Sequence, residues 1–305
     1  MNLVVHLAIL FFFPPLLSGV IGKTKAWFGG RKGPPVLQPY FDLIKLVQKG
    51  TVYSSSTSWI FPAGPVVSLV CVIAAGLLIP IVSSQTPIGF VGDMILFAYL
   101  LGLGRFFIVL AAMDTGSSFE GMGASREATF SALVEPALIL SLVILGLQAK
   151  SLTFAEALQP VVWTGWLRAA PLLLCLLLAL SVVFLTENSR MPVDDPATHL
   201  ELTMVHEVMV LDHSGVDLAF ILYGSSIKLF LMTVLFVRAI FPGGGLDTAF
   251  SSVTVLLECG FVAVLVGVTE SILARLRLPR IPQFLLGASA LGIVGIGILF
   301  LRGLG

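Results

Sequence analysis

The sequence predicts an all-α integral membrane protein with about eight transmembrane helices and an amphipathic interfacial helix in the first cytoplasmic loop. First, 57% of the residues are hydrophobic and only 11% are charged, whereas soluble domains carry about 25% charged residues. Second, eight segments approach the about 20 apolar residues that a helix needs to cross a bilayer. Third, the polar residues of segment 36–49 recur with the period of an α-helix, so that one face is polar and the other apolar. The formal net charge of zero argues against a nucleic-acid partner.

We expect one polytopic domain over residues 1–305, without internal repeats. The expected spans are 2–22, 60–82, 94–114, 127–148, 168–187, 217–240, 249–270 and 282–302. Pro14 and Pro15 should break or kink the first span, because proline lacks the backbone donor and clashes with the preceding turn. This span is not expected to be a cleaved signal peptide, since Lys23 and Lys25 follow the apolar run instead of preceding it.

The basic residues predict the orientation of the spans. One set of loops comprises 23–59, 115–126, 188–216 and 271–281. These loops contain Lys23, Lys25, Arg31, Lys32, Lys45, Lys49, Arg126, Arg190, Arg275, Arg277 and Arg280. The opposite loops and the C-terminal end contain only Lys150 and Arg302. The positive-inside rule therefore predicts that the four basic loops are cytoplasmic and that both termini lie outside.

The first cytoplasmic loop contains an amphipathic segment from Val36 to Lys49. Its polar stripe consists of Gln38, Asp42, Lys45 and Lys49, and the opposite side is apolar. Gly50 is a natural stop for such a helix. The pattern is typical of a helix that lies in the membrane interface, and a docking site for a soluble partner is an equal alternative.

The second cytoplasmic loop, from Asp114 to Glu127, is rich in glycine. Gly116, Gly121 and Gly123 predict a flexible or tightly turning segment, with Ser125 placed to cap the next helix. The loop lacks the ending of a phosphate-binding loop, so we expect a structural role.

The third cytoplasmic loop concentrates ionisable groups. Seven of the seventeen acidic residues lie in this region, together with three of the four histidines. The seven are Glu187, Asp194, Asp195, Glu201, Glu207, Asp212 and Asp217. Ionisable groups close to hydrocarbon are costly and usually functional, so we expect a site here. The alternative is a solvated acidic loop.

The same loop predicts a helix from about Pro196 to Leu211, capped by Asp194 or Asp195. His199, His206 and His213 would share one face of a longer helix, but neighbours would lie about 10 Å apart. That spacing excludes a single bridging metal and leaves a proton relay or a plain polar face. Cys71, Cys175 and Cys259 stand alone in apolar runs, so we expect no metal, iron–sulfur or disulfide site in this chain.

Further ionisable residues lie within or at the ends of the spans. They are Arg105, Asp114, Glu135, Glu187, Lys228, Arg238, Glu258 and Glu270. At such depths charged groups pair, face the bundle interior or line a hydrated path. We see no nucleophile–base pair and no nucleotide or haem motif, so the chain by itself is not expected to be catalytic.

Several motifs give the chain a resemblance to a known family. They are RKGP at 31–34, LQPYFDLIKL at 37–46, GRFF at 104–107, DTGSSF at 114–119, GASREA at 123–128, LVEP at 133–136 and ARLRL at 274–278. In this order they resemble the subunit 1 family of respiratory complex I, the NADH-quinone oxidoreductase. They resemble more closely the membrane subunit of membrane-bound nickel–iron hydrogenases of the formate-hydrogenlyase and hydrogenase-4 type. The short gap between the first two motifs is typical of the hydrogenase branch.

The third loop also resembles that family. The matching residues are Glu187, Arg190, Pro192, Asp194, Glu201 and Leu202. Val193 stands where the family has an aromatic residue, and Ala197 and His199 stand at usually acidic places. The segment 212–215 arrives about three residues late. These departures favour a divergent hydrogenase branch over a quinone-binding member.

The resemblance implies a connector between a peripheral redox arm and antiporter-like proton-pumping subunits in the cytoplasmic (inner) membrane. Cofactors are implied only in partners: a nickel–iron site in the large subunit and iron–sulfur clusters in the small one. The implied proton-path residues are Asp114, Glu127, Glu135, Glu187, Arg190, Asp194, Glu201, Glu207, Asp212, Glu258 and Glu270. The implied docking residues for the arm are Arg31, Gly33, Pro34, Asp42, Lys45, Arg275 and Arg277.

Two other functions compete with the connector. One is a quinone-site subunit of a complex I-like oxidoreductase that takes electrons from NADH or ferredoxin. The other is a stand-alone ion or solute carrier, which the lack of repeats argues against.

Overall fold

The computed structural model describes residues 3–82, 85–158, 170–194, 205–241 and 248–303, and in these ranges the protein contains helices and no strand. Eight of the described helical segments are long and apolar enough to cross a membrane, as the sequence predicts. They begin with α1 (Leu3–Phe12) and α2 (Pro14–Phe28), which count together as one span. The others are α4 (Ile60–Leu78), α5 (Asp93–Asp114), α6 (Ser118–Ala149), α9 (Ala170–Glu187), α10 (Gly215–Ile240), α11 (Thr248–Ile272) and α12 (Ile281–Gly303).

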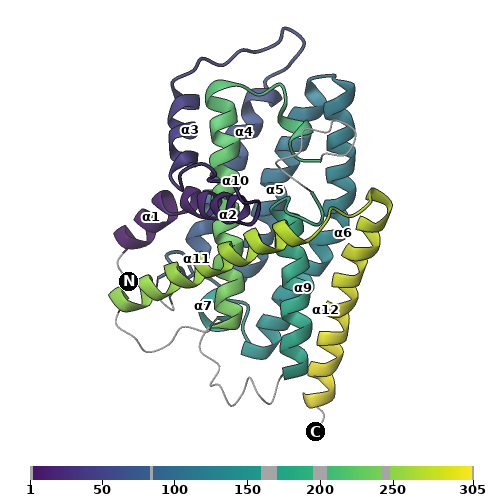
Figure 1. The fold of residues 1–305 in the computed structure, drawn as a ribbon. Coiled ribbons are helices and arrows are strands. Elements are labelled where there is room, and N and C mark those ends of the chain that lie inside the picture. The colour runs from purple at the N-terminus through teal and green to yellow at the C-terminus, as the bar shows by residue number, and fades with distance from the viewer. Residues whose placement is uncertain (1–2, 83–84, 159–169, 195–204, 242–247, 304–305) are drawn as a thin grey trace.

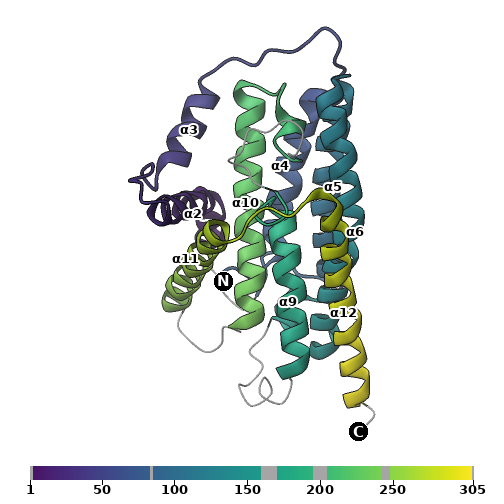
Figure 2. The same cartoon turned by 45° about the vertical axis from the view of Figure 1, so that its right-hand side comes forward.

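The first span is interrupted where the prolines predict it. α1 ends at Phe12 and α2 begins at Pro14, since a proline at the first helical position needs no backbone donor. α2 continues to Phe28, six residues beyond the expected end, so Lys23 and Lys25 lie on the helix and not in a loop. α2 and α11 pack together and run across the upright helices α4, α5, α6, α9, α10 and α12 (Figures 1 and 2).

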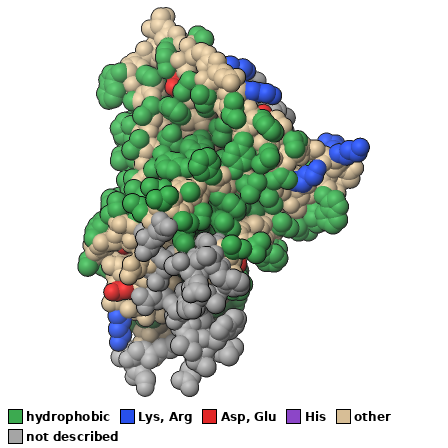
Figure 3. All heavy atoms as spheres, turned by 90° about the vertical axis from the view of Figure 1, so that its left-hand side faces the viewer, with side chains coloured by type: hydrophobic (Ala, Val, Ile, Leu, Met, Phe, Trp, Pro, Cys, Tyr) green, Lys and Arg blue, Asp and Glu red, His purple; other side chains and the backbone are tan. Residues whose placement is uncertain are grey.

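The centre of the bundle is α10, which contacts α2, α3, α4, α9 and α11. Its buried side chains include Ile227, Phe230, Leu231 and Leu235, each fully covered. Helices in a bilayer associate through this kind of close van der Waals packing. Hydrophobic side chains also cover much of the outer surface. Figure 3 shows them on the side of the molecule that bears α1 and α3, with Lys and Arg side chains near the edge.

The amphipathic helix in the first loop is confirmed as α3 (Gln38–Val47). Gln38 donates to Asp42 at 2.8 Å along the predicted polar stripe. The Tyr40 hydroxyl donates to the carbonyl of Phe12, which ties α3 to the break between α1 and α2. No residue of α3 is fully buried, as expected for a helix that lies at an interface.

The glycine-rich second loop is shorter than predicted. Only residues 115–117 connect α5 and α6, with the turn at Gly116 (φ +70°), and α6 is helical from Ser118. Ser125 caps nothing, because its hydroxyl donates to the Met122 carbonyl within the helix. Gly123 has a packing role: a Cβ there would lie 3.1 Å from the carbonyl oxygen of Val205. Gly123 therefore permits close contact with the third loop.

The predicted helix from Pro196 to Leu211 is wrong in its described part. Residues 205–207 form a turn, and a single 3-10 turn, η1 (Val208–Val210), follows. Residues 195–204, including Asp195, Pro196, His199 and Glu201, lie outside the described residues. No continuous helix joins His206 to His213, so the predicted face shared by the histidines does not form over that interval. The remaining short elements are α7 (Phe154–Ala157) and η2 (Leu278–Arg280).

Candidate functional site

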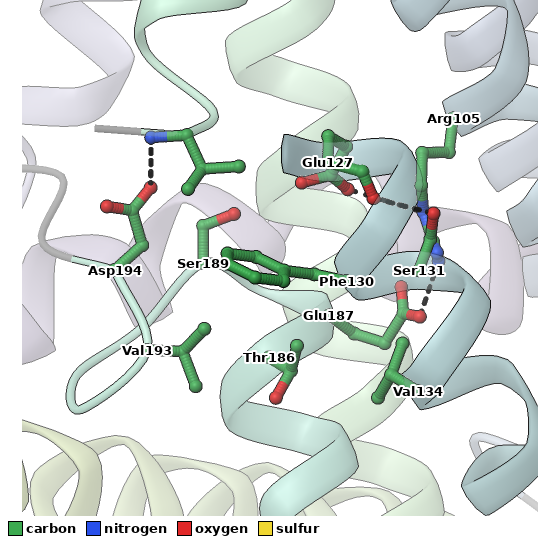
Figure 4. A pocket seen from close by; sticks show the side chains of 11 residues that line it. Arg105, Glu127, Phe130, Ser131, Val134, Thr186, Glu187, Ser189, Val193 and Asp194 are labelled. Atoms are coloured by element: carbon green, nitrogen blue, oxygen red, sulfur yellow. Dashed lines mark hydrogen bonds and ion pairs between the residues drawn. The ribbon is translucent and has the colours of Figure 1, made fainter. Parts of the chain in front are cut away.

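Arg105 of α5 lies at the centre of a cluster of charges contributed by four helices. Its Nε lies 3.5 Å from Oε1 of Glu127, and its Nη1 lies 3.4 Å from Oε1 of Glu135. Its Nη2 donates to Glu187 at the end of α9. Lys228 of α10 approaches the other oxygen of Glu187 at 3.8 Å. Figure 4 shows Arg105 reaching towards Glu127 and Glu187 from the opposite wall.

The two carboxylates of α6 that Arg105 contacts face different sides of the helix. Glu127 and Glu135 are eight residues apart, which is about 12 Å along the axis and about 80° around it. Glu127 therefore faces the interior, whereas Glu135 faces outwards, with 17% and 48% of their side chains exposed. The planar guanidinium has donors on three nitrogens and always carries its charge, so it suits contact with several carboxylates.

A second group of charges surrounds Glu270 near the end of α11. Its carboxylate is fully buried and lies 3.0 Å from the Lys25 ammonium and 3.2 Å from Nη1 of Arg190. The helix α2 contributes the lysine, and the turn after α9 contributes the arginine. This arrangement depends on α2 continuing past the expected end of the first span.

A third group forms around Asp194. One carboxylate oxygen accepts from Arg275 at 2.9 Å, and the other accepts the backbone N–H groups of Val205 and His206, each at 3.2 Å. Asp194 thus connects the two described ends of the third loop to the segment after α11. The sequence predicted Asp194 as a helix cap, but the groups that it satisfies in the described structure lie eleven and twelve residues later.

A cavity of about 370 Å³ connects these groups. Glu187 and Lys228 line it from the first group, Arg190 from the second and Asp194 from the third. A smaller hollow of about 10 Å³, close to the volume that one water needs, lies between Arg105, Glu127, Glu187 and Asp194 (Figure 4). Polar groups at this spacing could exchange protons through intervening water.

Two histidines of the third loop also line the cavity. Burial and the nearby Lys228 ammonium lower the pKa of His206 to about 4. Burial likewise lowers the pKa of His213 to about 4, and its ring stacks on Phe61 with centroids 4.0 Å apart. Both imidazoles are therefore neutral at pH 7.

Of the other expected proton-path residues, Asp114, Asp212 and Glu258 do not line the cavity, whereas Glu207 does. Asp114 accepts the backbone N–H of Ser58 at 2.6 Å, which anchors the end of the first loop. Asp212 has an exposed side chain, and its backbone N–H donates to buried Glu120 at 2.9 Å. Glu258 of α11 lies near Arg238, which donates to the Ile81 carbonyl at 2.9 Å, and neither lines the cavity. Glu207 lines the cavity.

The expected docking residues divide into two sets. Arg31, Gly33, Pro34, Asp42, Lys45 and Arg277 are exposed, whereas Arg275 is half-buried against Asp194. Gly33, which follows Arg31 and Lys32, has φ +61°. Glycine adopts this left-handed conformation without steric cost, which explains its presence there.

Three basic residues of the site, Arg105, Lys228 and Lys25, were not among the predicted site residues. Arg105 and Lys228 were recognised only as ionisable groups inside spans, and the structure brings both to Glu187. Their position in apolar helices is the signal that could have found them, because a charge at that depth is normally paired or functional.

Within the described ranges, no three His, Cys, Asp or Glu side chains lie together in a way that could hold a metal ion. The charges of the site are instead compensated by the basic residues described above.

Comparisons with known proteins match almost the entire chain. The family described as NADH dehydrogenase matches residues 1–300. Formate hydrogenlyase subunit 4 of Escherichia coli (strain K12) is 32% identical over 281 residues, which cover 90% of each chain. Hydrogenase-4 component C of the same organism is 35% identical over 276 residues, covering 88% of this chain and 86% of that one. A chain in the structure of the membrane-bound sulfane sulfur reductase, an archaeal respiratory membrane complex, has the same fold, with a TM-score of 0.84 over 97% of both chains at 22% identity.

Proposed function

The chain belongs to the NADH dehydrogenase family, the subunit 1 family of complex I, and from this premise we propose that it connects a redox arm to proton-pumping subunits. The complex is a membrane-bound nickel–iron hydrogenase of the formate-hydrogenlyase or hydrogenase-4 type. The chain itself is a non-catalytic multi-pass subunit. The nickel–iron site and the iron–sulfur clusters belong to its partners, the large and small subunits of the arm. The identities of 32% and 35% to two hydrogenase components support this branch.

One observation carries the proposal: ionisable groups surround a cavity that extends from the third loop to the centre of the bundle. The group around Asp194 and the group around Glu270 lie beside the expected cytoplasmic loops, and the Arg105 cluster lies in the spans. A row of such groups is what proton entry into a membrane requires. The positive-inside distribution supports the orientation, with the arm docked on the side of α3 and Arg277.

The shared arginine couples the protonation of the three carboxylates. Glu127, Glu135 and Glu187 all interact with one guanidinium, so a proton added to one of them frees Arg105 to interact more strongly with the others. A charge that appears a few ångströms away shifts a carboxyl pKa by about 1–3 units. A charge change in the docked arm would therefore alter which carboxylate holds a proton.

Conservative substitutions test this connector function in the intact complex. We expect Glu127→Gln and Glu187→Gln to reduce proton translocation at least about ten-fold, because an amide keeps the shape but does not exchange the proton. Dye-linked hydrogen oxidation by the arm should stay unchanged. Glu156→Gln, at an exposed position of α7, is the matched control. Normal translocation in both cluster variants would contradict the proposal.

A second function is favoured by the size of the cavity. Its volume of about 370 Å³ falls in the range of about 300–1,000 Å³ typical of small-molecule pockets, so a quinone-site subunit of a complex I-like oxidoreductase is the competing assignment. Metal analysis of the complex, purified in mild detergent through a C-terminal tag, separates the two. Nickel with iron supports the hydrogenase, and iron without nickel plus quinone reductase activity supports the alternative. Recovery of the chain alone would contradict both.

A further inference from the structure

Glu135 is the most exposed carboxylate of the Arg105 cluster, and it faces away from the cavity. Its side chain is 48% exposed, compared with 17% for Glu127 and 0% for Glu187. It lies in a groove of about 660 Å³ between α5 and α6. The other lining residues are mainly hydrophobic and include Ile95, Tyr99, Leu103, Phe106 and Ile139. The groove therefore joins the outer surface of the bundle directly to the charge cluster.

The charges of the cluster are unbalanced on this side. Three carboxylates interact with the two cations Arg105 and Lys228, and Lys228 lies 3.8 Å from Glu187 and also interacts with Glu127, on the cavity side of the cluster. Arg105 is divided among all three acidic side chains. An ionised carboxylate that faces hydrocarbon is costly and is normally paired. When all three carboxylates are ionised, the cluster has one more negative charge than positive, and the groove beside Glu135 is where a further cation can approach it.

The floor of the groove is shaped for a close neighbour. Ala98 and Gly102 line it one helical turn apart on α5. A Cβ on Gly102 would lie 3.5 Å from Oε1 of Glu135, so the space left by this glycine lies next to the carboxylate. Small residues four positions apart allow transmembrane helices to approach closely. Tyr99 and Phe106, which are 71% and 55% exposed, also line the groove from α5.

We propose that this groove seats a transmembrane helix of a partner subunit and that this helix presents a lysine or arginine to Glu135. The proposal rests on the connector function, which requires the cluster to meet a membrane partner. It assigns that partner a chemistry: an apolar helix with one basic residue at the depth of Glu135. A lipid acyl chain could fill the apolar part of the groove but would bring no cation to Glu135, which would still share Arg105 with Glu127 and Glu187.

Photo-crosslinking in the purified native complex identifies the occupant. A photoreactive amino acid is placed at Tyr99 or Phe106, and at Ile293 of α12, an exposed position (62%) that reports the yield of lipid adducts. We expect the groove positions to form adducts with an apolar segment of one membrane subunit that has a lysine or arginine within one helical turn. Adducts with lipid alone, or with a helix that lacks a basic residue, would overturn the proposal.

Two substitutions test the seat and the charge separately. Gly102→Leu fills the floor, and we expect at least a ten-fold loss of the cross-linked partner per molecule of this subunit after purification. Gly287→Leu is the matched control, since a Cβ at Gly287 meets nothing within 4 Å. Glu135→Lys should also expel the partner, and replacing the partner's basic residue with glutamate should restore it. Retention of the partner in Gly102→Leu and Glu135→Lys would refute the docking site.

The docking site for a partner helix and the connector function are tested by different measurements. Partner retention is measured by subunit composition, whereas the connector function is measured by proton translocation. A partner seated in the groove with normal pumping in Glu127→Gln and Glu187→Gln would contradict the connector alone. Lipid in the groove with loss of pumping in those variants would contradict the docking site alone.

Discussion

Replacing Arg105 with methionine tests how strongly the cluster depends on one shared cation. The Arg105 side chain is 9% exposed, and its guanidinium interacts with Glu127, Glu135 and Glu187. Its loss leaves the Lys228 ammonium, 3.8 Å from Glu187, as the remaining cation of the group. Removing one partner of a buried ion pair costs about 3–5 kcal/mol. Because three carboxylates lose their partner together, we expect a loss near 5 kcal/mol.

The cysteines provide a direct assay of this loss. Cys71 and Cys259 are 5% and 0% exposed, so a thiol-reactive reagent should label them only after the helices separate. Labelling is followed against temperature in the purified complex, with the two peptides quantified by mass spectrometry. At roughly 2–4 °C per kcal/mol, the midpoint for Arg105→Met should fall by about 10 °C or more.

A second substitution checks the cause. In the double variant Arg105→Met/Glu187→Gln, the carboxylate of Glu187, which has lost Arg105, is replaced by a neutral amide. We therefore expect the free energy of unfolding to be about 2 kcal/mol higher than the sum of the two single effects predicts. Glu156→Gln, at an exposed position, should leave the midpoint unchanged. A midpoint for Arg105→Met within about 2 °C of the wild type, or strictly additive effects in the double variant, would refute the shared-cation argument.

Three further changes test the third loop. Asp194→Asn should weaken the contacts of that carboxylate by about 1–3 kcal/mol and raise hydrogen exchange at residues 205–210, and unchanged exchange would count against its anchoring role. Gly123→Val should cost about 1–3 kcal/mol by overpacking against the same segment, whereas Gly121→Ala, where a Cβ meets nothing within 4 Å, should be neutral or stabilising. His206 and His213, with a folded pKa of about 4 against about 6.5 unfolded, contribute stability that is complete above pH 6.5 and is lost as the pH falls towards 4. Each contributes at most roughly 3 kcal/mol, so the thermal midpoint should fall between pH 7.5 and 5, and less steeply in His213→Phe.

The sequence predicted the features that depend on local pattern. Apolar length predicted the eight candidate spans, and Pro14 predicted the break between α1 and α2. The polar stripe of Gln38, Asp42, Lys45 and Lys49 predicted the helix that the structure has as α3 (Gln38–Val47), because helix period and amphipathicity are properties of neighbouring residues. The resemblance to the family also rested on short motifs, which alignment over nearly the whole chain confirms.

Features that depend on distant contacts were missed. The glycines after Asp114 suggested a loop, yet Gly123 lies within α6 and the third loop packs so closely that a Cβ there would lie 3.1 Å from the carbonyl oxygen of Val205. The helix start that Asp194 or Asp195 was predicted to cap lies outside the described residues, but Asp194 has partners in Arg275 and the N–H groups of Val205 and His206, far along the chain. No local pattern indicates such partners.

The convergence on Arg105 has a consequence for how protons could move under the proposed function. Arginine does not deprotonate in proteins, so Arg105 cannot carry the proton itself. Under the proposed function the proton would instead pass between the carboxylates that Arg105 holds, of which Glu187 lines the cavity and Glu135 lines the groove. Those two acids contact different nitrogens of the same guanidinium. A proton that neutralises one of them lets Arg105 interact more strongly with the other, so the arginine would act as an electrostatic link between the two sides of the bundle.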